Sequence, residues 1–83
     1  MDRADAFVKL REAAVEVLGV DDDAILEEAR FKEDLDADSL DLVELVMALE
    51  ERFDITVPEE DLEGVLTIGN SLDLVMGKLA AKS

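Results

Sequence analysis

The sequence predicts an all-α fold: a small four-helix bundle of three longer helices and one short helix, with a long loop between the first two. Hydrophobic residues make up 49% of the 83 residues, and three phenylalanines are the only aromatic side chains. The aliphatic residues recur at steps of three and four, without the alternation of a half-buried strand. There is no cysteine for a disulfide. A single domain over residues 1–83 must therefore be stabilised by its apolar core.

The first half of the chain predicts one helix and one long loop. The helix is expected from about Ala4 to Leu18, and Gly19 stands where a left-handed residue would end it. Its apolar face carries Phe7, Leu10, Ala14, Val17 and Leu18. The loop from Val20 to Asp38 is acidic, and Asp23 is expected to cap a short turn within it. Four apolar side chains are expected to hold this loop to the core: Ile25, Leu26, Phe31 and Leu35.

The second helix is expected from about Ser39 or Leu40 to Arg52. Asp38 is its predicted N-cap, because a carboxylate there can accept a hydrogen bond from a free backbone N–H of the first turn. Its wide apolar face consists of Leu42, Val43, Leu45, Val46, Leu49 and Phe53. The opposite face carries a narrow acidic stripe at Asp41, Glu44, Ala48 and Glu51, with Leu40 and Met47 at its border.

The last third of the chain predicts a short helix and a longer one. Pro58 suits the start of a short helix through residues 59–62, since the first turn does not need the N–H that proline lacks. Thr67 is expected to cap the last helix, and Gly77 inside that helix is expected to cost about 1 kcal/mol relative to alanine. The apolar face of this helix carries Ile68, Leu72, Val75 and Leu79.

The net charge of −15, from 23 acidic and eight basic residues, excludes ordinary nucleic-acid binding. Between Glu33 and Gly77 there are fourteen acids and one base, Arg52. Such a field attracts basic partners and favours a monomer. No stretch is long and apolar enough to span a membrane, and the N-terminal residues lack the pattern of a signal peptide. The expected location is the cytoplasm.

The residue types exclude most catalytic chemistry. With neither His nor Cys, the usual nucleophilic triads and zinc sites lack their ligands, so we expect no enzyme activity and no metal site. Asp34, Asp36 and Asp38 match positions 1, 3 and 5 of a calcium-binding EF-hand loop. The match then fails, because Ser39 stands where glycine is needed and Leu45 where a bidentate glutamate is needed. Weak divalent-ion binding by clustered carboxylates remains an alternative.

Three serines are present, Ser39, Ser71 and Ser83. Ser39 lies at the head of the second helix, where free backbone N–H groups favour a nearby anion. By residue chemistry alone, Ser39 is either a simple first-turn residue or a site of covalent modification.

The tripeptide Asp38-Ser39-Leu40 resembles the Asp-Ser-Leu signature of acyl carrier proteins. The surrounding string DLDADSLDLVELVMALEERF, residues 34–53, is similar to the loop and second helix of the free-standing bacterial members. Residues 55–58 (ITVP) and 67–69 (TIG) resemble the family's third helix and the start of its fourth. The likeness covers essentially the whole chain, most specifically residues 31–79.

This resemblance implies that a separate phosphopantetheinyl transferase attaches 4′-phosphopantetheine from coenzyme A to Ser39. The chain would then carry acyl groups as thioesters to enzymes of fatty acid, polyketide or lipopeptide biosynthesis. The acidic residues implied to dock basic patches on partner enzymes are Asp38, Asp41, Glu44, Glu50 and Glu51, and Leu40 and Met47 are the implied apolar contacts beside them. The residues implied to shelter an acyl chain are Val43, Val46, Leu49, Val57, Leu62 and Val65.

Two positions depart from the family pattern. Asp36 stands where a glycine is usual, and Lys32 where an apolar residue is more common. A peptidyl or aminoacyl carrier is the closest alternative, although such carriers usually have glycines before the serine. An acidic helical adaptor or divalent-ion-binding module is the alternative outside the carriers. Met1 and the lack of linkers lead us to expect a free-standing protein.

Overall fold

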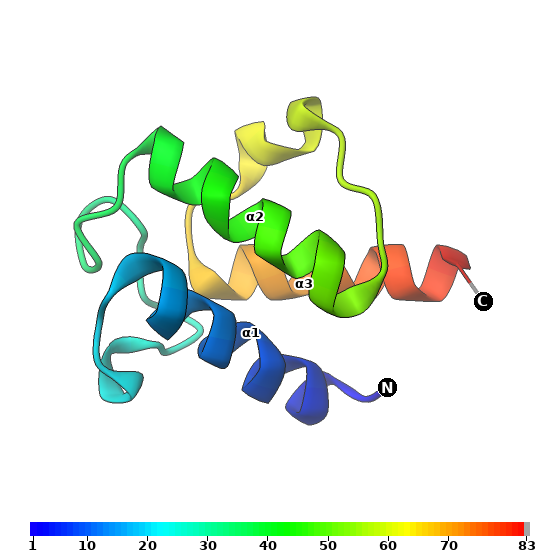
Figure 1. Cartoon of the computed structure of the whole chain (residues 1–83), viewed down its shortest axis with the longest axis horizontal. Helices are drawn as coiled ribbons and strands as arrows, with labels where there is room; N and C mark the ends of the chain where they lie inside the picture. The colour runs from blue at the N-terminus through cyan, green and yellow to red at the C-terminus, as the bar shows by residue number, and fades with distance from the viewer. Residues whose placement is uncertain (83) are drawn as a thin grey trace.

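The computed structural model describes residues 1–82, in which helices are joined by loops and no strand is present. The α-helices are α1 (Arg3–Leu18), α2 (Ser39–Phe53) and α3 (Ile68–Lys82), and the short 3₁₀ helices are η1 (Asp22–Ala24) and η2 (Glu59–Gly64). Helix α1 runs opposite to α2 and α3 (Figure 1). The predicted fold of three longer helices and one short helix is therefore confirmed, with η2 as the short helix.

Helix α1 begins one residue earlier than expected because Asp2 caps it. The Asp2 side chain accepts a hydrogen bond from the backbone N–H of Asp5 at 2.9 Å. At the other end Gly19 adopts the left-handed conformation, with φ of 68°, and donates its N–H to the carbonyl of Val15. The predicted C-cap is thus present.

The loop after α1 follows the core as expected, with one exception. Ile25, Phe31 and Leu35 are buried, but Leu26 is 50% exposed. The prediction for Leu26 was wrong because the chain turns after η1, where the Ala29 N–H bonds the Leu26 carbonyl, and the Ala29 side chain takes the buried position. The expected cap at Asp23 is also wrong: Asp23 lies within η1, whose N-cap position is Asp21.

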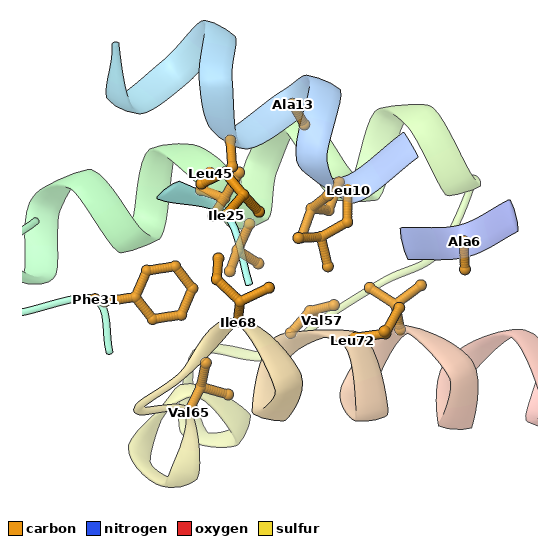
Figure 2. Close-up of a cluster of buried hydrophobic side chains, with 14 of the residues drawn as sticks. Ala6, Leu10, Ala13, Ile25, Phe31, Leu45, Val57, Val65, Ile68 and Leu72 are labelled. Atoms are coloured by element: carbon orange, nitrogen blue, oxygen red, sulfur yellow. The ribbon is translucent and has the colours of Figure 1, made fainter. Parts of the chain in front are cut away.

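The core lies between the three α-helices and the loop. Figure 2 shows Leu10 of α1, Leu45 of α2 and Ile68 of α3 pointing toward one another, with Phe31 approaching from the loop. Each of the three aliphatic side chains is fully buried, and Phe31 is 4% exposed. At about 25 cal/mol per Å² of buried apolar area, such side chains supply the main stabilising term in a domain without cross-links.

Helix α3 is capped by Thr67, as predicted: the backbone N–H of Asn70 donates to the Thr67 hydroxyl at 3.1 Å. The loop meets this end of α3, because the Ile68 N–H bonds the Ala29 carbonyl and the Phe31 N–H bonds the Leu66 carbonyl. No helix within residues 1–82 has the length and apolar character needed to cross a membrane.

Candidate functional site

Ser39 is the first residue of α2 and its side chain is exposed. The helix start is held by a reciprocal pair of hydrogen bonds. The Asp38 carboxylate accepts from the Asp41 N–H at 3.0 Å, and the Asp41 carboxylate accepts from the Asp38 N–H at 3.2 Å. The N–H groups of Ser39 and Leu40 bond to no acceptor within the described residues. Two backbone donors at the positive end of the helix dipole are therefore free beside the Ser39 hydroxyl.

The turn before Ser39 depends on the backbone of Asp36. This residue has φ of 53°, in the left-handed region, which glycine adopts most easily. The turn brings the Ala37 N–H to within 2.7 Å of the Phe31 carbonyl and buries the Ala37 side chain. The position where the sequence departs from the family's glycine is thus one where glycine has a physical advantage.

A hollow of about 1010 Å³ opens beside Ser39. It lies where the end of the loop, the first turn of α2 and the segment before α3 come together, as Figure 1 shows for the ribbons. Its walls combine apolar side chains with charged and polar ones. The lining residues are Arg30, Phe31, Lys32, Glu33, Asp36, Ala37, Asp38, Ser39, Leu42, Val65, Leu66, Thr67 and Asn70.

Of the six residues implied for an acyl shelter, Val65 alone lines this hollow. Val46, Leu49 and Val57 are buried in the core, and Val43 and Leu62 are half-buried. The sequence reasoning missed Leu42 and Leu66 as neighbours of Ser39. Helical spacing could have identified Leu42, since it lies three residues after Ser39 on the same helix. No sequence pattern could have identified Leu66, because it lies before α3 and no helical spacing relates it to Ser39.

The docking residues implied by the resemblance differ in their surroundings. Leu40 and Met47 are large apolar side chains with 67% and 60% exposure, and Glu44 and Glu51 are exposed along the same helix. Asp38 is exposed as well, whereas Asp41 is half-buried.

Glu50 forms a hydrogen bond to the segment that follows α2. It is half-buried, and its Oε2 accepts the backbone N–H of Val57 at 2.9 Å. This bond fixes the segment between α2 and η2. Glu50 therefore stabilises the fold, in addition to any part it plays in docking.

One group of charged side chains near the hollow consists of Arg30 and its acidic neighbours. The guanidinium of Arg30 lies 3.3 Å from Asp34 and 3.8 Å from Glu33. The Asp34 carboxylate also accepts the Arg30 backbone N–H at 2.8 Å. That backbone bond, followed by the guanidinium, holds the pKa of Asp34 below its usual value. Within residues 1–82, no cluster of three or more acidic side chains is arranged to hold a metal ion.

Ser71, the second serine within the described residues, is 1% exposed. Its hydroxyl donates to the Ile68 carbonyl at 2.7 Å. This hydroxyl is therefore satisfied inside the core and out of reach of a modifying enzyme.

Comparison with known proteins finds a family model that covers most of the chain. Residues 8–75 match the family model described as "Phosphopantetheine attachment site". The chain is 46% identical over 76 residues to an acyl carrier protein of Rubrobacter xylanophilus, covering 92% of this chain and 94% of that protein. It is 48% identical over 69 residues to an acyl carrier protein of a Sulfurovum species, covering 83% of this chain and 92% of that protein.

Solved structures show the same likeness. The acyl carrier protein of Thermotoga maritima superposes with a TM-score of 0.86 at 32% identity, over 100% of this chain and 96% of that one. The acyl carrier protein of Enterococcus faecalis superposes with a TM-score of 0.74 at 27% identity, over 94% and 99%.

Proposed function

This chain belongs to the acyl carrier protein family, and we propose that Ser39 is the residue to which its 4′-phosphopantetheine group is attached. The observation that supports this assignment is the exposure of Ser39 at the start of α2, beside the hollow. The Ser71 hydroxyl, by contrast, is buried and bonded. When bound, the prosthetic group supplies a thiol that holds an acyl group as a thioester.

The surroundings of Ser39 fit such a group. Its hydroxyl is open to solvent, and the free N–H groups of Ser39 and Leu40 can donate to a phosphodiester oxygen. The nearest carboxylates, Asp38 and Asp41, accept each other's backbone N–H groups. Their negative charge remains unfavourable to the phosphodiester, but both are held in defined positions by these bonds.

The residues of this chain position the cargo, and the chemistry belongs to other enzymes. Ser39 is a substrate for a separate transferase, and the chain is proposed to have no catalytic activity of its own. Partners with basic patches would meet the exposed face of α2, which we call the α2 docking face. It comprises Asp38, Leu40, Asp41, Glu44, Met47 and Glu51, with Glu50 at its edge. Electrostatic docking of this kind is brief and fast, as delivery to several enzymes requires.

An acyl group is proposed to enter the hollow first against Leu42, Val65 and Leu66. Deeper entry would bring it to the other residues implied by the resemblance, Val43, Val46, Leu49, Val57 and Leu62. Most of these pack in the core, so deeper entry requires repacking. An aliphatic core with few rings adapts to this more readily than one built on large aromatic side chains.

The pathway is proposed to be fatty acid biosynthesis, with polyketide or lipopeptide assembly as alternatives. A peptidyl or aminoacyl carrier is the second candidate function. The proposal also includes a monomeric, cytoplasmic protein, and the net charge of −15 supports the monomer by opposing self-association.

Loading of Ser39 can be tested directly. The purified chain is incubated with coenzyme A and a broad-specificity phosphopantetheinyl transferase, and its intact mass is recorded. The wild type and Ser71→Ala should each gain one phosphopantetheine, and Ser39→Ala should gain none. A gain on Ser39→Ala, or none on the wild type, would overturn the assignment. An acidic adaptor or ion-binding module predicts no covalent change.

A further inference from the structure

Lys32 differs from the other cations of this molecule. Among the eight basic side chains, all of which lie within residues 1–82, seven have a partner. Arg3, Arg30, Arg52, Lys78 and Lys82 form ion pairs with carboxylates. Lys9 and Arg11 lie over the rings of Phe53 and Phe7, at 5.9 and 5.8 Å from the ring centroids. Lys32 makes neither kind of contact with any described residue.

The unpaired Lys32 side chain lies close to the proposed attachment site. Lys32 lines the hollow beside Ser39. Glu33, Asp36 and Asp38 line the same hollow, yet none of their carboxylates comes within ion-pair distance of the lysine. Arg30, the other cation in the wall, is bound to Asp34. An unpaired ammonium in a chain with an excess of acids is thus available to an anion from outside the fold.

A second group in the wall has an unused donor. The side-chain oxygen of Asn70 accepts the N–H groups of Leu66 and Thr67, at 3.0 and 3.1 Å. These two bonds fix the orientation of the amide, and its NH₂ group has no acceptor among the described residues. Four donor groups at the hollow have no acceptor among the described residues: the Lys32 ammonium, the Asn70 NH₂, the Ser39 backbone N–H and, next to the lining, the Leu40 backbone N–H. The Asp36 carboxylate in the same wall is also unpaired among those residues.

We propose that Lys32 is a positioning residue that, with Asn70, binds an anionic oxygen of the group carried on Ser39. This inference rests on the proposed function. Two sources can supply such an oxygen to the hollow. One is the phosphodiester that joins the arm to Ser39, and the other is the carboxylate of a dicarboxylic acyl group at the far end of the arm. In either case Lys32 holds the carried group against the hollow and limits its exposure to solvent.

The test compares Lys32→Gln with the wild type and with Lys9→Gln, a control that removes the same charge from α1. Each protein is loaded enzymatically with coenzyme A, butyryl-coenzyme A or succinyl-coenzyme A, and intact mass confirms loading. Butyryl and succinyl arms have the same number of carbons and differ by one carboxylate. The change in melting temperature on loading is measured at low ionic strength, together with the ³¹P resonance of the phosphodiester.

For each protein, the shift is the melting temperature of the loaded form minus that of the unloaded form. We expect this shift to be about 2–5 °C lower in Lys32→Gln than in the wild type. In Lys9→Gln the change should equal that of the wild type. If the phosphodiester is the anion, the difference appears with all three arms and the ³¹P resonance moves in Lys32→Gln. If the acyl carboxylate is the anion, the difference appears with the succinyl arm alone.

Equal loading-dependent changes and an unmoved ³¹P resonance in Lys32→Gln would overturn the role of Lys32 and leave the proposed function intact. A wild-type chain that gains no mass would overturn both. Intact mass therefore separates failure of the Lys32 inference from failure of the attachment site.

Discussion

Gly69 donates its backbone N–H to the carbonyl oxygen of Glu27 at 2.8 Å, and a Cβ atom on Gly69 would lie 3.0 Å from that same oxygen. The start of α3 and the long loop are therefore in backbone contact. The side chain of Glu27 also binds Arg3, which reaches Asp73 of α3 as well. One loop residue thus connects α1 to α3, near the segment that forms part of the wall beside Ser39.

Gly69→Ala should lower the free energy of unfolding by about 1 kcal/mol, because its Cβ would push against a backbone oxygen that cannot rotate away. Gly77→Ala is the matched control in the same helix. Nothing lies within 4 Å of a Cβ there, so the better helix propensity of alanine should raise stability by about 0.5–1 kcal/mol. Urea unfolding of both variants checks this, and a stabilised Gly69→Ala would contradict it.

Asp36→Gly should be more stable than Asp36→Ala by about 1 kcal/mol. Both variants remove the same carboxylate, but alanine has a steric penalty at a φ of 53° that glycine lacks. Chemical denaturation of the two variants measures this difference. Equal stabilities would show that the turn before Ser39 relaxes away from the left-handed conformation when the residue is changed.

Glu44→Lys should slow reactions with partner enzymes about tenfold at low ionic strength, because it places a cation at the centre of the α2 docking face. Added salt should reduce the difference in rate between Glu44→Lys and the wild type. Glu12→Lys makes the same charge change on the exposed side of α1 and should have a smaller effect. Loading rates with a phosphopantetheinyl transferase provide the measurement. Rates for Glu44→Lys that match those for Glu12→Lys at low salt would count against a specific docking face.

Added sodium chloride or Mg²⁺ should raise the melting temperature by several degrees. The net charge of −15 makes carboxylates repel one another in the folded state, and counter-ions screen that repulsion. Ion pairs such as Lys82 with Asp54 also weaken in salt, but an exposed pair contributes little stability to lose. Calorimetry over a series of salt concentrations tests whether repulsion between carboxylates or attraction within ion pairs has the larger effect on stability. A melting temperature that falls with salt would show that attraction within ion pairs has the larger effect.

Asp34 should contribute to stability at neutral pH and lose that contribution in acid. Its pKa lies below the ordinary value of 3.8 in the folded state, mainly through the Arg30 backbone N–H. The contribution is therefore complete above about pH 4 and is lost as the pH falls through the lower, folded pKa. Asp34→Asn should be less stable than the wild type at pH 7, with a gap that closes in acid. A gap independent of pH would exclude this linkage.

The helices and their ends were predictable because the forces that set them are local. Asp38 and Thr67 cap α2 and α3 as expected, since a cap bonds an N–H two or three residues away. The path of the long loop was only partly predictable. Leu26 has the same apolar character as its buried neighbours, and only the turn that buries Ala29 decides that it faces solvent.

The order of the helices, the acidic face of α2 and the position of Ser39 at a helix start were all predictable from local patterns. Each follows from periodicity, capping chemistry and charge over a few neighbouring residues. The surroundings of that serine depend instead on the packing of distant segments. Lys32, Leu42 and Asn70 line one hollow because Phe31 and Ile68 form backbone hydrogen bonds that join the loop to the start of α3. Contacts between residues so far apart in the chain depend on how the whole core packs, and no local pattern encodes them.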